Sequence, residues 1–103
     1  MVDKVKQEIN FYDYAGNKSL IILNVKRIRK DKIRVGKTKT TVYYLYLHNG
    51  VVLFVKKRTN IGKVLDYLYD KMDVNKPVEI TIVGEEKYGH VRYHIKYIFY
   101  SKK

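Results

Sequence analysis

Positions 90–100 have the cleanest alternation between hydrophobic and polar residues in the chain, and this alternation is the strongest structural signal in the sequence. Five hydrophobic side chains recur there at every second position: Val91, Tyr93, Ile95, Tyr97 and Phe99. Because successive side chains of a strand point to opposite faces, this period predicts a β-strand with one buried face. Pro77 opens a second alternating segment, 78–83. The C-terminal quarter of the chain is therefore expected to be sheet.

One segment, residues 60–72, has a different period. Its hydrophobic residues are spaced for one face of a helix: Ile61, Val64, Leu65, Leu68 and Met72. Either Asn60 or Thr59 is a suitable N-cap, since a short polar side chain can accept a hydrogen bond from the first helical turn. We expect a single helix of about three turns here.

Three β-rich runs precede the helix, at 20–28, 40–47 and 51–58. The first loses its apolar phase near Lys26 and Arg27, as a bend or bulge would cause. The basic stretch 29–39 is then either a loop or the flared end of two long strands. The N-terminal stretch 6–14 is ambiguous: it either pairs as a strand with 20–28 or lies as a short helix over the end of the barrel.

The order of these elements is strand, strand, strand, helix, strand, strand. This order resembles the oligonucleotide/oligosaccharide-binding (OB) fold, a five-stranded antiparallel barrel with a helix between its third and fourth strands. The resemblance covers about residues 18–100 and concerns element order only. It implies a mainly β single domain over 1–103, in which 1–17 is an extension or an extra strand. An α+β sheet with one packed helix is the alternative.

The charge of the chain is concentrated. Residues 14–65 hold thirteen Lys and Arg against one acid, Asp31, whereas bases and acids cancel elsewhere, so this segment accounts for the net +12. Such a block repels itself, and a polyanionic partner would relieve that repulsion. Nucleic acid is the common partner of this kind. A lysine-rich surface that serves solubility or heat resistance is the alternative, but four Glu are too few to pair with seventeen Lys.

The hairpin around residues 48–50 allows a binding face to be predicted. If His48, Asn49 and Gly50 form a three-residue loop, Leu47 pairs with Val51. Tyr43, Leu45, Leu53 and Val55 then face the core, and the opposite face bears Tyr44, Tyr46, Val52, Phe54, Lys56 and Arg58. Rings interleaved with cations suit single-stranded nucleic acid, since bases stack on rings while phosphates contact cations. A two-residue Asn-Gly turn would mix the two sets.

The sequence gives little sign of catalysis. The chain has no cysteine, and its two serines, Ser19 and Ser101, have no evident base nearby. On a strand, His90 and His94 would be about 13 Å apart, too far for a shared metal. We therefore expect a non-enzyme without cofactor or metal.

The sequence thus predicts a protein that binds single-stranded DNA or RNA with little sequence preference. The expected nucleic-acid-binding residues are Lys26, Arg27, Arg29, Lys30, Lys32, Arg34, Lys37, Lys39, Tyr44, Tyr46, Phe54, Lys56 and Arg58. A virion-type or protein-interaction domain with an acidic partner, and the coating of duplex DNA, are the alternatives. The lack of cysteine and of a signal-like or membrane-spanning apolar segment favours the cytoplasm (of the host, if the protein is viral), and a Lys/Ile/Tyr/Val bias hints at a thermophile. A homodimer is left open, and no membrane partner is expected.

Overall fold

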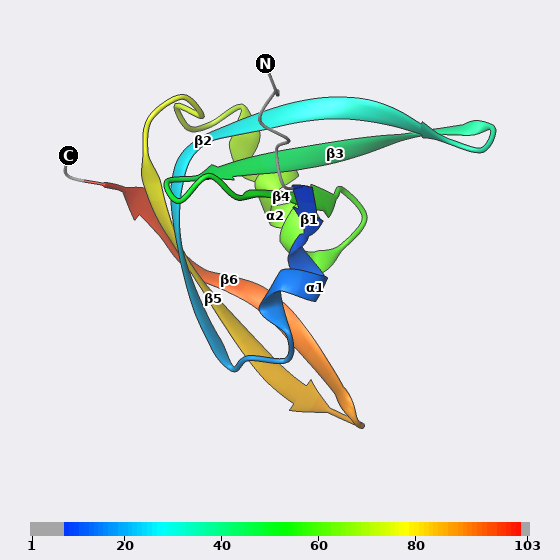
Figure 1. Cartoon of the computed structure of the whole chain (residues 1–103), viewed down its shortest axis with the longest axis vertical. Coiled ribbons are helices and arrows are strands. Elements are labelled where there is room, and N and C mark those ends of the chain that lie inside the picture. Colours follow the sequence, from blue (N-terminus) through cyan, green and yellow to red (C-terminus); the bar gives the residue numbers. More distant parts are fainter. Residues whose placement is uncertain (1–7, 102–103) are drawn as a thin grey trace, which may run out of the picture.

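The computed structural model describes residues 8–101 of the chain. Over that range strands predominate, and two helices interrupt them (Figure 1). In chain order the elements are β1 (Glu8–Asn10), α1 (Phe11–Ala15), β2 (Leu20–Val35), β3 (Thr38–Leu47), β4 (Val52–Lys56), α2 (Asn60–Tyr69), β5 (Val78–Lys87) and β6 (His90–Tyr100). The prediction of a mainly β protein is confirmed.

The six described strands form one mixed sheet in the order β1-β4-β3-β2-β5-β6. β1 is parallel to β4, and the other pairs are antiparallel. The sheet curls into a half-barrel with β1 and β6 at its two edges (Figure 1). The predicted closed barrel of five antiparallel strands is therefore only roughly matched. The reason lies in α1, which packs Phe11 against Tyr93 of β6 with 5.6 Å between ring centroids, so that side chains fill the opening.

The N-terminal segment differs from one of its two predicted arrangements. A pairing with 20–28 was the strand alternative, but β1 pairs instead with β4, where Ile9 lies opposite Leu53. The short helix of the other alternative is present as α1. The Asn10 side chain caps α1 by accepting a 2.9 Å hydrogen bond from the Tyr12 amide, and Gly16 at φ +55° ends it. Residues 6 and 7 lie outside the described range.

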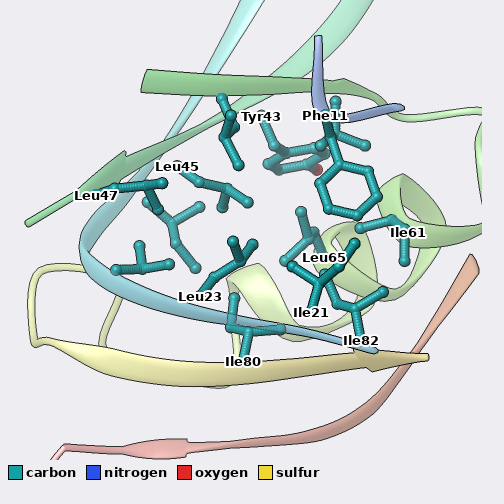
Figure 2. Close-up of a cluster of buried hydrophobic side chains, with 14 of the residues drawn as sticks. Phe11, Ile21, Leu23, Tyr43, Leu45, Leu47, Ile61, Leu65, Ile80 and Ile82 are labelled. Atoms are coloured by element: carbon teal, nitrogen blue, oxygen red, sulfur yellow. The ribbon is translucent and has the colours of Figure 1, made fainter. Parts of the chain in front are cut away.

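The core fills the concave side of the curled sheet. Figure 2 shows side chains of β2, β3 and β5 converging with Phe11 of α1 and with Ile61 and Leu65 of α2. The alternation predicted for β2 places Ile21, Leu23 and Val25 in this cluster, and all three are buried. The fold is therefore closed on one side by the sheet and on the other by the two helices.

Helix α2 begins where the sequence predicted but ends earlier. Thr59 is its N-cap, and the Thr59 hydroxyl accepts a 3.0 Å hydrogen bond from the Gly62 amide. The amides of Lys71 and Met72 both bond to the Leu68 carbonyl, and this tight turn ends the helix at Tyr69 instead of Met72. Val64 and Leu68, which the helical spacing places on the same face as Ile61 and Leu65, are only half-buried.

The β2–β3 hairpin extends well beyond the rest of the molecule (Figure 1). Its strands pair without interruption from Arg27 and Tyr46 outward to Val35 and Thr38, around a two-residue turn. Gly36 occupies the first turn position at φ +63°, a conformation that favours glycine. Of the two alternatives for residues 29–39, the flared end of two long strands is correct. We call residues 30–41 the arm.

Candidate nucleic-acid interface

The β3–β4 hairpin has the register that the sequence predicted. The Leu47 amide donates a 2.9 Å hydrogen bond to the Val51 carbonyl, and the loop closes through Gly50 at φ +92°. Tyr44 pairs with Phe54 and Tyr46 with Val52. The buried side chains Tyr43, Leu45, Leu53 and Val55 therefore face the core, and Tyr44, Tyr46 and Phe54 lie on the opposite face, here called the outer face.

A β-bulge in β2 aligns two arginines with the tyrosines. The pairing shifts between Val25 and Arg27, with Lys26 as the extra residue. The buried residues Val25 and Ile28 are therefore three positions apart, and Arg27 and Arg29 fall on the outer face, opposite Tyr46 and Tyr44. The loss of phase predicted near Lys26 and Arg27 is confirmed as a bulge.

These four side chains form a stacked series that we call the outer ladder: Arg27, Tyr46, Arg29 and Tyr44. The Arg27 guanidinium carbon lies 4.3 Å from the centroid of the Tyr46 ring. The Arg29 guanidinium carbon lies 4.6 Å from the centroid of the Tyr44 ring and 6.0 Å from that of the Tyr46 ring. Cations over tyrosine faces at these distances attract the ring quadrupole, so each ring orients a guanidinium plane.

Hydrogen bonds fix Arg29 within the ladder. Its Nε donates to the Tyr46 hydroxyl at 2.8 Å, and its Nη1 contacts the Asp31 carboxylate at 3.1 Å. The bond to Tyr46 raises the pKa of Arg29, and burial raises the pKa of the Tyr44 phenol. The guanidinium therefore stays charged and the Tyr44 phenol stays neutral at physiological pH.

The aromatic side chains of the outer face are only partly exposed to solvent. Tyr44, Tyr46 and Phe54 are half-buried, and the neighbouring Val42 and Val52 are buried outside the core cluster. Lys56 pairs with Val42 at the end of β4 on the same face. The outer face thus offers a supported, mostly apolar floor with the exposed Arg27 above it.

The cations of the arm lie on the other face of the same hairpin. Lys30, Lys32 and Arg34 alternate with the outer-face residues of β2 and pair with Tyr43, Thr41 and Lys39. This face continues the concave side of the sheet, since Tyr43 is part of the core. The sequence predicted one surface for all the basic and aromatic residues. The structure separates them, because neighbouring residues of a strand point to opposite faces.

Three further cations extend this concave face at the start of α2. A hollow of about 330 Å³ is lined by Thr40, Thr41, Lys57, Arg58, Lys63 and Asp66. Arg58 was predicted on the face of Tyr44 and Tyr46, but β4 ends at Lys56 and the chain turns before Arg58. We call Lys30, Lys32, Arg34 and Lys39 of the arm, together with Lys57, Arg58 and Lys63, the inner track.

Sequence reasoning did not select Lys57 and Lys63 as site residues. Lys57 lies one position beyond Lys56, in the phase of Val55, and its amide bonds to the Thr41 carbonyl at 3.0 Å. The predicted register already implied that phase. Lys63 stands in the first turn of the predicted helix, and nothing in the sequence indicated that this turn lies beside the arm.

The two remaining predicted residues lie apart from both sets. Lys26, at the bulge, lines a shallow hollow with Arg27, Tyr46 and Gly50. Lys37 occupies the tip of the arm and is exposed. Lys26 therefore adjoins the outer ladder, and Lys37 is accessible from either side of the arm.

Comparison with known proteins gives no match: no family model fits the sequence, and neither a curated protein nor a solved structure is significantly similar to it. Within residues 8–101, neither helix has the length and apolar character that crossing a membrane requires. In the same range, His, Asp and Glu do not gather in threes that could hold a metal ion.

Proposed function

We propose that this protein binds single-stranded nucleic acid with little sequence preference, without catalysing a reaction on it. The observation that supports this function best is the outer ladder, in which Arg27 and Arg29 lie over Tyr46 and Tyr44. Unpaired bases stack on aromatic rings and on guanidinium planes, and phosphates bind the same cations. A basic protein surface without such planes would bind by charge alone.

The ladder suits a flexible strand for a second reason. Its arginines are oriented before any ligand arrives, by the Tyr46 hydroxyl and by the ring faces. Less side-chain freedom is then lost on binding, which favours affinity. Because stacking uses a face that every base has, the expected sequence preference is weak.

The element order supports a finer description of the fold as an OB-like barrel. β4, β3, β2, β5 and β6 follow one another across the sheet with α2 between β4 and β5. In this description, β1 and α1 occupy the gap between β4 and β6. We place the protein in the cytoplasm, a proposal that the absence of cysteine supports.

The test replaces the two arginines of the ladder with side chains that keep their positive charge. Arg27→Lys with Arg29→Lys keeps both charges but removes the planar groups that stack. We expect affinity for an oligothymidine strand, measured by fluorescence anisotropy, to fall about tenfold, since stacking contributes roughly 1–3 kcal/mol per base. Lys30→Arg with Lys32→Arg, on the other face, is the matched control and should leave this affinity unchanged.

Salt dependence separates the proposed function from its competitors. The logarithm of affinity should fall with the logarithm of salt concentration in both wild type and the Arg27→Lys, Arg29→Lys variant, with slopes equal within about 0.5, because the number of neutralised phosphates does not change. Equal affinity of the variant and wild type for single strands would contradict the stacking model. It would favour a basic surface that meets an acidic protein partner or coats duplex DNA.

A further inference from the structure

We propose that the inner track is a second nucleic-acid site, which binds the phosphate backbone of a duplex. The track lies on the face of the β2–β3 hairpin opposite the outer ladder, since Lys30 and Lys32 alternate with Arg29 and Asp31. Simultaneous binding of a single strand and a duplex rests on the function proposed above. Duplex binding by the track does not depend on it.

The cations of the track have the spacing of a backbone contact. Lys30, Lys32 and Arg34 project from one face at every second residue, about 6.6 Å apart along the strand. This is close to the separation of successive phosphates in a nucleic-acid strand. Lys39 lies opposite Arg34, and Lys57 follows the same face toward α2. A phosphate backbone can therefore meet a cation at each step along the arm.

The track lacks what the ladder offers to unpaired bases. Tyr43 is fully buried, and its hydroxyl is engaged by Asp66. The Tyr69 ring is half-buried, with the Lys30 ammonium 5.7 Å from its centroid. Contacts here are consequently to phosphate alone. Because a duplex has a higher density of phosphate charge than a single strand, more counterions are released per contact and the duplex is favoured.

The shape of the arm also fits a duplex. It is a two-stranded antiparallel ribbon that projects past the body of the molecule (Figure 1). A ribbon of this width can enter the major groove of B-DNA. The residues of its tip, from Arg34 to Lys39, are all exposed. Such a ribbon would bring the track alongside the phosphates that border the groove.

The experiment uses the full chain, a short DNA duplex of two helical turns and an oligothymidine strand. The inner variant is Lys30→Glu, Lys32→Glu, Arg34→Glu. We expect it to lose at least tenfold in duplex affinity and to reduce the salt slope on duplex by about 3, one for each lost contact. Its affinity for oligothymidine should change less than threefold. Lys18→Glu, Lys87→Glu, Lys96→Glu makes the same change of charge on exposed residues far from the arm and serves as the control.

A capture assay tests whether both sites act at once. Immobilised oligothymidine should retain labelled duplex through wild-type protein. The inner variant should bind the strand but retain no duplex. Competition between the two ligands for one site, or an equal loss of both affinities in the inner variant, would overturn the second site. Failure of the proposed function has a different signature: the Arg27→Lys, Arg29→Lys variant would bind single strands normally while the duplex results stand.

Discussion

The hydroxyl of Tyr43 donates a hydrogen bond to the carboxylate of Asp66, which ties the centre of β3 to helix α2 beneath the inner track. The Tyr43 ring is fully buried, and the Asp66 side chain is one-third exposed. Burial, followed by this hydrogen bond, raises the pKa of Tyr43. The bond in turn lowers the pKa of Asp66, with help from the Lys57 ammonium, whose Nζ is 3.8 Å from the carboxylate.

The raised pKa of Tyr43 predicts a loss of stability at alkaline pH. The unfolded chain releases the phenolic proton near the ordinary pKa of 10.0, whereas the folded chain retains it. Above about pH 10 the folded state therefore binds more protons than the unfolded state, and the free energy of unfolding should fall by about 1.4 kcal/mol per pH unit. Tyr43→Phe should flatten this fall, measured by urea denaturation between neutral and alkaline pH.

The control for that series is Tyr67→Phe. Tyr67 lies on the exposed side of α2, with 64% of its surface accessible, so folding does not remove its phenol from water. This variant should follow the wild-type pH curve. A Tyr43→Phe curve parallel to wild type above pH 10 would show that the buried phenol does not govern alkaline stability.

Asp66→Asn should strengthen duplex binding while weakening the fold. The substitution removes a negative charge that lines the same hollow as Lys57, Arg58 and Lys63. Affinity for duplex should rise several-fold at low salt, and the gain should shrink as salt screens the charges. Neutral-pH stability should fall by about 1 kcal/mol, because the bond from Tyr43 is no longer charge-assisted. Titration and thermal melting measure the two effects.

The same variant has an acid-pH signature. The pKa of Asp66 is lower in the folded chain, so its stabilising effect is present above the ordinary value of 3.8 and is lost as pH falls through the folded value. Asp66→Asn should therefore lose less stability than wild type below about pH 4. Asp70→Asn, one turn along the helix, is the matched control. A binding gain as large in this control would attribute the effect to net charge rather than to the hollow.

Tyr46→Phe should loosen the outer ladder without removing a ring. The Tyr46 hydroxyl is the acceptor for Arg29 Nε, so its loss frees the guanidinium to leave the stack. Single-strand affinity should fall about threefold to tenfold, in line with the loss of one half-buried hydrogen bond worth about 1 kcal/mol. Tyr44→Phe keeps the ring that lies under the Arg29 guanidinium and should bind as wild type. If the two variants bound single strands with the same affinity, binding would not depend on the orientation of Arg29.

Gly62→Ala should damage the fold more than any exposed substitution in α2. A Cβ atom at this position would lie 1.9 Å from the Lys56 carbonyl oxygen and 2.9 Å from the Cα of Lys57. Both are backbone atoms, which cannot shift without moving the chain around them, so the helix must move away from the end of β4. We expect a loss of several kcal/mol, or failure to fold, in thermal melts. Lys63→Ala, the exposed neighbour, should melt within a few degrees of wild type.

Local periodicity accounts for most of what could be predicted here. The alternation of β2, the helical spacing of α2 and the three-residue loop at 48–50 each depend on neighbouring residues, and each is present in the fold. The single buried face predicted for β6 is only partly correct. A bulge at Lys96 shifts the phase after Ile95, so Ile98 packs against the core while Tyr97 and Phe99 are exposed. Even the bulge was visible, because one extra residue separates the apolar positions Val25 and Ile28.

The partner of β1 could not be predicted in this way. Nothing local to residues 8–10 distinguishes pairing with β2 from parallel pairing with β4, since β1 leads directly into Phe11, which packs against the distant Tyr93. The division of the candidate site between two faces could not be predicted for a related reason. A basic run reads as one surface in the sequence, but the strand period divides it between two faces, and only the long unbroken pairing of β2 with β3 reveals this.

The bulge at Lys26 sets the parity of everything that follows it in β2. If β2 kept Lys26 but ran as a regular strand without the bulge, Arg29, Asp31 and Ile33 would turn toward α2, and Lys30, Lys32 and Arg34 would cross to the tyrosine side. The bulge thus decides which set of cations lies beside the tyrosine rings and which lies on the concave side. A strand that lost the bulge would exchange the two surfaces along the whole arm with no change in composition, whereas deletion of Lys26 itself would leave both surfaces in place.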